Sequence, residues 1–152
     1  MQLHCLYFLL PMIKLRRALP EDEEAVFALA RDMATSFQVE RPAFSQTFAY
    51  SLAAENICLM VAETSEGIVG YVLGMAHAAF YANGNVAYVE EIMVKAEVRR
   101  KGVGKSLMEG FEAWAVSKES RLIALATRRA SNFYQAIGYA ESATYFRKVI
   151  GG

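Results

Sequence analysis

The stretch that most constrains the fold of this chain is residues 86–110, which reads VAYVEEIMVKAEVRRKGVGKSLMEG. An apolar run with strand character leads into a basic turn with glycines, and the turn leads directly into a run with helical spacing. The first turn of a helix has backbone N–H groups without helical partners, and its dipole places partial positive charge there. Because glycines also let a ligand approach the backbone, we expect a phosphate or pyrophosphate to bind at this turn.

The turn carries four cations within the seven residues 99–105: Arg99, Arg100, Lys101 and Lys105. The whole chain has 16 Lys and Arg against 16 Asp and Glu, so the local cluster stands out from a neutral background. This balance gives no indication of nucleic-acid binding. With 152 residues, 55% of them hydrophobic and 21% charged, the chain has the composition of a globular domain with a full core.

The two cysteines, Cys5 and Cys58, form no CxxC pair and have no histidines at zinc spacing. We therefore expect no metal site and a reduced, cytoplasmic protein. The apolar segment at residues 1–11 lacks the basic region and cleavage site of a signal peptide and is too short to span a membrane. We expect one domain over residues 12–152, preceded by an upstream extension. Alternatives for residues 1–11 are an extra strand, a docking arm or a membrane-associated segment.

Hydrophobic spacing and turn residues predict a mixed α/β domain with consecutive hairpins in its middle. The expected strands are residues 13–18, 57–63, 68–78, 86–94, 121–127 and 145–150. Four helices are expected. The first begins at residue 20, and the other three cover residues 42–55, 102–117 and 130–137.

Two familiar glycine motifs do not fit the turn. A P-loop needs a glycine five residues before Gly104, where Arg99 stands. A dinucleotide fingerprint needs a third glycine where Leu107 stands, and it opens a parallel unit rather than following antiparallel strands.

The chain instead resembles the GNAT superfamily of acyl-CoA-dependent N-acetyltransferases. The family's Arg-x-x-Gly-x-Gly signature is met by residues 99–104, after an apolar strand that ends at Val94. A second block, Ala-x-x-Phe-Tyr-x-x-x-Gly-Tyr, is met by residues 130–139. The resemblance covers about residues 12–150. It implies a mostly antiparallel sheet of six to seven strands, splayed between the fourth and fifth strands, with helices on both faces.

The resemblance also implies acetyl-CoA as the donor and assigns residues to it. Backbone N–H groups of residues 100–105 would hold the pyrophosphate of coenzyme A, and the strand before the turn would pair with its pantetheine arm. The N–H of Val94, or of Met93, would donate to the thioester oxygen. Where the family often has Asn near the pantetheine arm, this chain has Thr127. The full set implied to bind the donor is Ile92, Met93, Val94, Arg99, Arg100, Lys101, Gly102, Val103, Gly104, Lys105, Thr127, Asn132 and Phe133.

Three residues are candidates for catalysis. Direct transfer needs a neutral acceptor amine, whereas an alkylamine is mostly protonated at neutral pH. Glu90 or Glu91, adjacent in an apolar strand and expected on opposite faces, would accept that proton. In the family the residue at Tyr134 protonates the departing thiolate. Each of the three also has a purely structural interpretation: the glutamates as surface carboxylates, and Tyr134 as a core aromatic.

We therefore expect an enzyme that acetylates a primary amine in a ternary complex with acetyl-CoA. The alternative is a non-catalytic acyl-CoA sensor of the same fold. The acceptor would be a small-molecule or peptide amine, with no nucleic-acid or membrane partner and with a homodimer as one option. Four aromatics fall in segments that flank the acceptor cleft in the family, although core packing explains them equally well: Phe37, Phe44, Phe80 and Tyr81.

Overall fold

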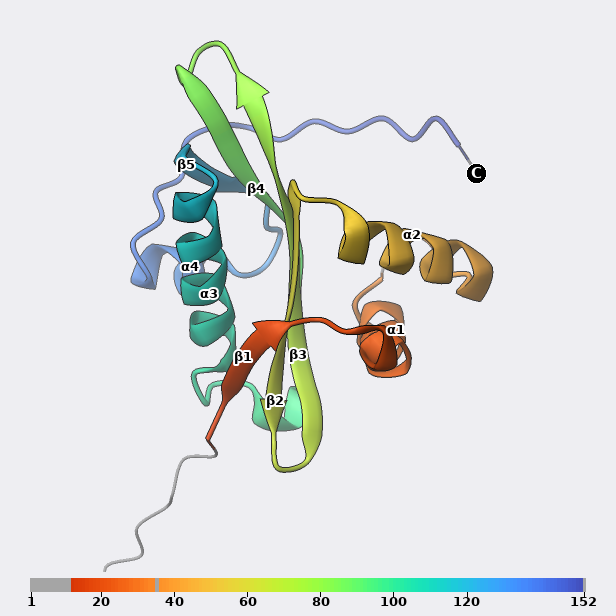
Figure 1. Cartoon of the computed structure of the whole chain (residues 1–152). Helices are drawn as coiled ribbons and strands as arrows, with labels where there is room; N and C mark the ends of the chain where they lie inside the picture. The colour runs from red at the N-terminus through yellow and green to blue at the C-terminus, as the bar shows by residue number, and fades with distance from the viewer. Residues whose placement is uncertain (1–11, 35, 152) are drawn as a thin grey trace, which may run out of the picture.

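A five-stranded sheet forms the centre of the protein in the computed structural model, which describes residues 12–34 and 36–151. The strands lie in sequence order, antiparallel at the first three junctions and parallel at the last (Figure 1). They are β1 (Lys14–Arg17), β2 (Ile57–Thr64), β3 (Gly67–Ala79), β4 (Gly84–Val94) and β5 (Ser120–Leu125). The first five expected strands are thereby confirmed.

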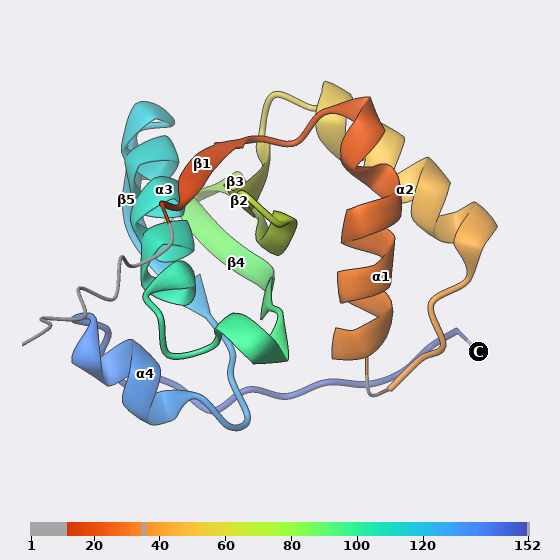
Figure 2. The same cartoon turned by 90° about the horizontal axis from the view of Figure 1, so that it is seen from below.

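Helices cover both faces of this sheet, as the resemblance implied. On one side lie α1 (Glu23–Met33), entered through the 3₁₀ turn η1 (Pro20–Asp22), and α2 (Arg41–Ala53). On the other side lie α3 (Val103–Ser117) and the short α4 (Ser131–Ala136) (Figures 1 and 2). The expected helices are therefore confirmed, and the arrangement is a three-layer αβα fold.

Each helical layer has its own hydrophobic core, because successive strand residues point to opposite faces. Tyr71 on β3 is buried toward α1 and α2, whereas its neighbour Val72 is buried toward α3. Phe111 fills the middle of the α3 layer and Phe48 anchors α2 in the other layer. The sheet thus separates the two hydrophobic cores.

The pairing of β4 is irregular at Glu90, next to the point where its pairing with β5 ends. Against β3, Glu91 pairs with Leu73 and Val89 pairs with Gly74, so Glu90 is an extra residue and forms a β-bulge. Against β5, pairing ends at Val89 and Leu125, whereas pairing with β3 continues to Val94. Residues 90–94 therefore belong to the sheet on one side only. This is the expected splay between the fourth and fifth strands.

One predicted strand is wrong. Residues 145–150 form no strand, and the described sheet has five strands rather than six to seven. Each face of a strand here would carry a cation, Arg147 or Lys148, between two apolar residues, and Tyr145, Phe146, Val149 and Ile150 are all exposed. The segment runs from α4 across to the α1–α2 side, where Arg147 donates a hydrogen bond to Ser36 (Figures 1 and 2).

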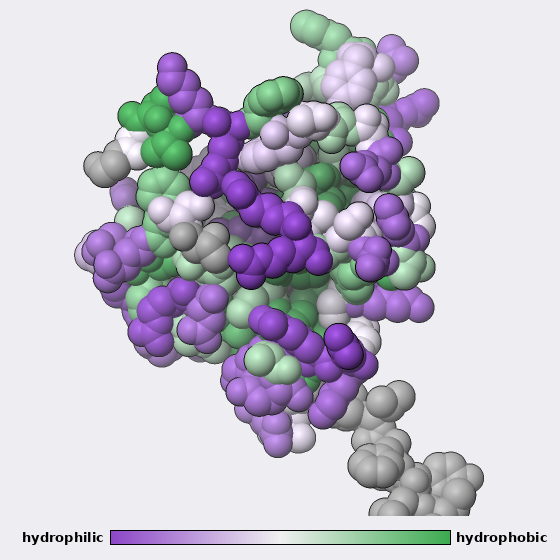
Figure 3. Space-filling model, turned by 180° about the vertical axis from the view of Figure 1, so that it is seen from behind, coloured by the Kyte–Doolittle hydropathy of each residue, from purple (hydrophilic) through white to green (hydrophobic). Residues whose placement is uncertain are grey.

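Figure 3 shows the back of the molecule as it is drawn in Figure 1. Hydrophilic residues extend across the middle and lower part of this face, with apolar groups between them. The expected N-terminal extension, residues 1–11, lies outside the described residues.

The bulge depends on Gly74, which lies on β3 where the register shifts. A Cβ atom there would meet the ring of Phe111 and would lie 2.6 Å from the carbonyl oxygen of Tyr88. We expect Gly74→Ala to lower the free energy of unfolding by about 1–3 kcal/mol, as overpacking does. Urea denaturation measures this, with Gly151→Ala, whose Cβ would meet nothing, as the control. Equal stability of the two variants would contradict the tight packing at the bulge.

Candidate functional site: a sheet opening between two helical layers

The unpaired edge of β4 presents backbone groups to open space. Lys95 donates its backbone N–H to the carbonyl oxygen of Val69 on β3, at 2.8 Å. Backbone groups alternate in direction along a strand, so the N–H groups of Val94 and Ile92 point the other way, where β5 has already ended. An extended ligand arm could pair with these groups as an added strand does.

The basic turn is tied to this edge. Arg99 donates from Nε to the carbonyl oxygen of Val94 at 3.1 Å, and its Nη2 lies 3.9 Å from the sulfur of Met93. After Arg99 the backbone is left-handed at Arg100, with φ of +63°, and at Gly102, with φ of +85°. Val103 is buried and anchors the start of α3 beneath the turn.

The start of α3 has free backbone donors. The first intrahelical bond runs from the N–H of Ser106 to the carbonyl oxygen of Gly102, at 3.0 Å. Within the described residues, the N–H groups of Gly102, Val103, Gly104 and Lys105 donate to no protein acceptor. Arg100, Lys101 and Lys105 are exposed around them. These donors and cations suit a pyrophosphate, so the turn fits the coenzyme A that the sequence predicts.

The residues expected downstream lie close to this turn but differ in their roles. Phe133 packs beside Gly104, where a Cβ atom would lie 3.4 Å from its ring. Thr127 already accepts a hydrogen bond from the N–H of Ala130 at 3.0 Å, just before α4, which leaves its hydroxyl hydrogen for another acceptor. Asn132 is exposed on α4.

Tyr134 is buried in the layer under α3, with 7% of its surface exposed. Its ring meets those of Phe133 and Tyr139 edge to face, at centroid distances of 5.0 and 5.9 Å. Burial raises the pKa of its phenol, so the group stays protonated at neutral pH. No hydrogen-bond partner for its hydroxyl is found within the described residues, which leaves this proton available to a ligand.

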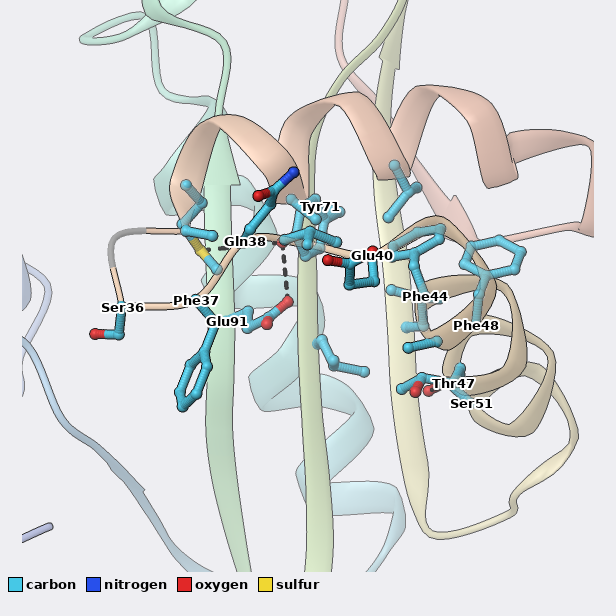
Figure 4. A pocket seen from close by; sticks show the side chains of 18 residues that line it. Ser36, Phe37, Gln38, Glu40, Phe44, Thr47, Phe48, Ser51, Tyr71 and Glu91 are labelled. Atoms are coloured by element: carbon cyan, nitrogen blue, oxygen red, sulfur yellow. Dashed lines mark hydrogen bonds between the residues drawn. The ribbon is translucent and has the colours of Figure 1, made fainter. Parts of the chain in front are cut away.

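On the other face of the sheet, residues of α1, of α2 and of the segment 36–40 line a pocket of about 500 Å³, a size typical of small-molecule sites (Figure 4). Its walls are mostly apolar, with Phe44 stacked on Phe48 at 5.7 Å between centroids. Among the described residues that line it, the charged ones are Glu40 and Glu91.

Glu91 is the one residue of β4 that lines this pocket. It accepts a hydrogen bond from the hydroxyl of Tyr71 at 2.9 Å, shown as a dashed line in Figure 4. Its burial raises the pKa of the carboxyl group, the hydrogen bond from Tyr71 lowers it, and the charge of Glu90 raises it further. The net direction is upward, which makes Glu91 a better proton acceptor than an exposed carboxylate.

Glu90 and Glu91 have different surroundings, but strand alternation does not account for this. Val89, two residues before Glu91, is buried on the α3 side, so the extra residue at the bulge is what places Glu91 on the opposite face. Glu90 is the exposed bulge residue and does not line the pocket. The bulge therefore turns the side chain of Glu91 toward the α1–α2 layer, while the backbone of Glu91 remains in the part of β4 that does not pair with β5.

The expected aromatics divide into two groups. Phe37 and Phe44 line the pocket, whereas Phe80 and Tyr81 are exposed at the β3–β4 turn and do not. The sequence reasoning missed Tyr71, the partner of Glu91. A signal was present, because a tyrosine inside a buried strand needs a partner for its hydroxyl.

Within residues 12–34 and 36–151, no group of three or more His, Cys, Asp or Glu side chains is arranged to hold a metal ion. None of the helices found there combines the length and the apolar composition that crossing a membrane requires.

Comparison with known proteins agrees with this geometry. The family described as the acetyltransferase (GNAT) domain matches residues 55–141, which is more than half of the chain. An aminoalkylphosphonate N-acetyltransferase of Salmonella typhimurium is 28% identical over 146 residues, 93% of this chain and 94% of that protein.

Two solved structures share the fold. Glucosamine-6-phosphate N-acetyltransferase from Arabidopsis thaliana superposes with a TM-score of 0.81 at 18% identity, over 92% of this chain and 99% of that one. An aminoglycoside N-acetyltransferase, AAC(6')-Iy, in complex with CoA, gives 0.79 at 19% identity, over 91% and 95%. Together with the family match, these findings show that the chain belongs to the GNAT family and is an acetyl-CoA-dependent N-acetyltransferase.

Proposed function

We propose that this protein acetylates a small-molecule primary amine by direct transfer, with Glu91 as the base and Tyr134 as the acid. One observation carries the proposal. Glu91 lies in the part of β4 beyond Val89, which no longer pairs with β5, and its side chain lines the pocket. The same residue thus adjoins the opening for a donor arm and the pocket for an acceptor. The Salmonella relative, by its name, also acts on a small-molecule amine.

Acetyl-CoA is the donor substrate and supplies the acetyl thioester. The free amides of residues 102–105 and the cations around them bind its pyrophosphate. The backbone of Ile92 and Val94 orients the pantetheine arm along the open edge of β4. The N–H of Val94 donates to the thioester oxygen, where negative charge develops as the amine attacks.

Two protons have to move during transfer. Glu91 accepts the proton that the ammonium form of the acceptor must lose, and its raised pKa suits this role. Tyr134 donates its phenolic proton to the thiolate that leaves as the C–S bond breaks, and its burial keeps that proton in place. We choose Glu91 over Glu90 because Glu90 is exposed outside the pocket. A non-catalytic sensor is not favoured, since the relatives named above are N-acetyltransferases.

The first prediction concerns these two side chains. We expect Glu91→Gln and Tyr134→Phe each to lower turnover by about 10²-fold or more, the usual effect of a proton-transfer group, while the Kd for coenzyme A stays unchanged. Thiol release in the presence of an amine panel measures turnover, and calorimetry measures binding. Full activity of Tyr134→Phe would remove this residue from the mechanism.

A second prediction tests the pyrophosphate turn. Gly102 and Gly67 both have positive φ, +85° and +100°, and a Cβ atom would touch nothing at either position. Alanine at each should therefore cause similar backbone strain, about 1 kcal/mol, in two different places. We expect Gly102→Ala to weaken coenzyme A binding about tenfold and Gly67→Ala, in the β2–β3 turn, to leave it unchanged. Equal effects on binding would contradict the placement of the pyrophosphate.

A third prediction follows from the pKa of Glu91. The acidic limb of kcat/KM reports the pKa of the base in the free enzyme. Tyr71→Phe removes a hydrogen bond that lowers this pKa, so the limb should move to higher pH. Glu90→Gln removes a charge that raises it, so the limb should move to lower pH. The exposed Glu66→Gln is the control and should shift nothing. Shifts of the same sign in both variants would contradict Glu91 as the base.

A further inference from the structure

The charges around the pocket indicate which class of amine it can accept, which membership of the family alone does not. Of the described residues that line it, none is Lys, Arg or His, and two are glutamates. Glu91 lies at the sheet and Glu40 precedes the first turn of α2. An acceptor bound between them meets negative charge from both.

Two arginines adjoin residues that line the pocket, and both already have partners. Arg41 lies over the ring of Phe27 and pairs with Glu24 at 2.7 Å. Arg147, on the C-terminal segment, donates to Ser36 at the pocket margin. Neither side chain is among those that line the cavity. A phosphonate or carboxylate on the acceptor would therefore lose its hydration with no cation inside to replace it.

The remaining walls suit an apolar body. Phe44 presents its ring between Phe27 and Phe48, and Leu59, Leu73 and Val26 form the adjoining surface. The buried hydroxyl of Ser51 already donates to the carbonyl oxygen of Thr47 at 2.8 Å, so it does not offer that hydrogen to an acceptor. Aromatic rings favour flat apolar or weakly cationic groups.

From this arrangement we propose that the acceptor is an amine on an aromatic or alkyl body without an anionic group, and that Glu40 and Glu91 exclude aminoalkylphosphonates. The inference rests on the proposed function, because it takes this pocket as the acceptor site. It separates the chain from the Salmonella relative in substrate class while keeping the same reaction. Exclusion by unpaired or repelled charge is a common source of specificity.

The experiment compares matched amines. Acetylation is followed by thiol release with 2-phenylethylamine and 2-aminoethylphosphonate, and with L-phenylalaninamide and L-phenylalanine, which differ in one anionic group. Binding of the same amines to the protein saturated with coenzyme A is measured by calorimetry. We expect kcat/KM to be about tenfold or more higher for the uncharged-body member of each pair, with binding in the same order.

Variants locate the cause of the preference. Glu40→Lys should raise kcat/KM for 2-aminoethylphosphonate about tenfold relative to 2-phenylethylamine, because it replaces a repelling charge with an attracting one. Glu55→Lys makes the same change just beyond α2, outside the pocket, and should leave the ratio unchanged. Phe44→Leu should raise KM for 2-phenylethylamine while the fold, checked by its melting temperature, is retained.

The outcomes separate the two proposals. A preference for 2-aminoethylphosphonate in both assays, lost in Arg147→Ala, would overturn the inference and show that this arginine completes an anion site; the proposed function would stand. Preferential binding of 2-phenylethylamine without acetylation of any amine would support the inferred pocket chemistry and contradict the proposed function.

Discussion

Parallel pairing of β4 with β5 stops at Val89 and Leu125, while residues 91–94 still pair with β3. The backbone of those residues must find hydrogen-bond partners outside the sheet, because unpaired buried backbone groups are costly. The bulge at Glu90 lies at the same point, opposite Gly74, where Phe111 leaves no room for a Cβ atom. Glu91, the pocket that it lines and the basic turn bonded to Val94 all adjoin this interruption.

Much of this was accessible from the sequence because the signals are local. The apolar strand, the basic glycine turn and the start of α3 are contiguous, and so is the block around Phe133 and Tyr134. The hydrogen bond from Tyr71 to Glu91 was not accessible, because it joins residues 20 apart across two strands whose register depends on the bulge. Residues 145–150 have strand composition, but tertiary context determines whether such a segment pairs.

The two faces of the sheet have different electrostatics. Around the start of α3, exposed cations and free amides attract a polyanion. In the pocket between α1 and α2, two carboxylates and aromatic walls suit an amine and oppose an anion. In the proposed mechanism the acceptor approaches as a cation and binds in the acidic pocket, and Glu91, whose carboxyl pKa is raised, accepts its proton. The sheet keeps these opposite fields apart.

Residue-level amide hydrogen exchange, with and without saturating coenzyme A, tests most directly whether the open edge of β4 holds the donor. Lys95, bonded to Val69, should exchange slowly in both states. Val94, which points to the side that β5 has left, should exchange rapidly in the free protein and slow about tenfold or more when coenzyme A is bound. If coenzyme A binds and Val94 exchanges at its original rate, the donor does not lie along β4 and the account is wrong.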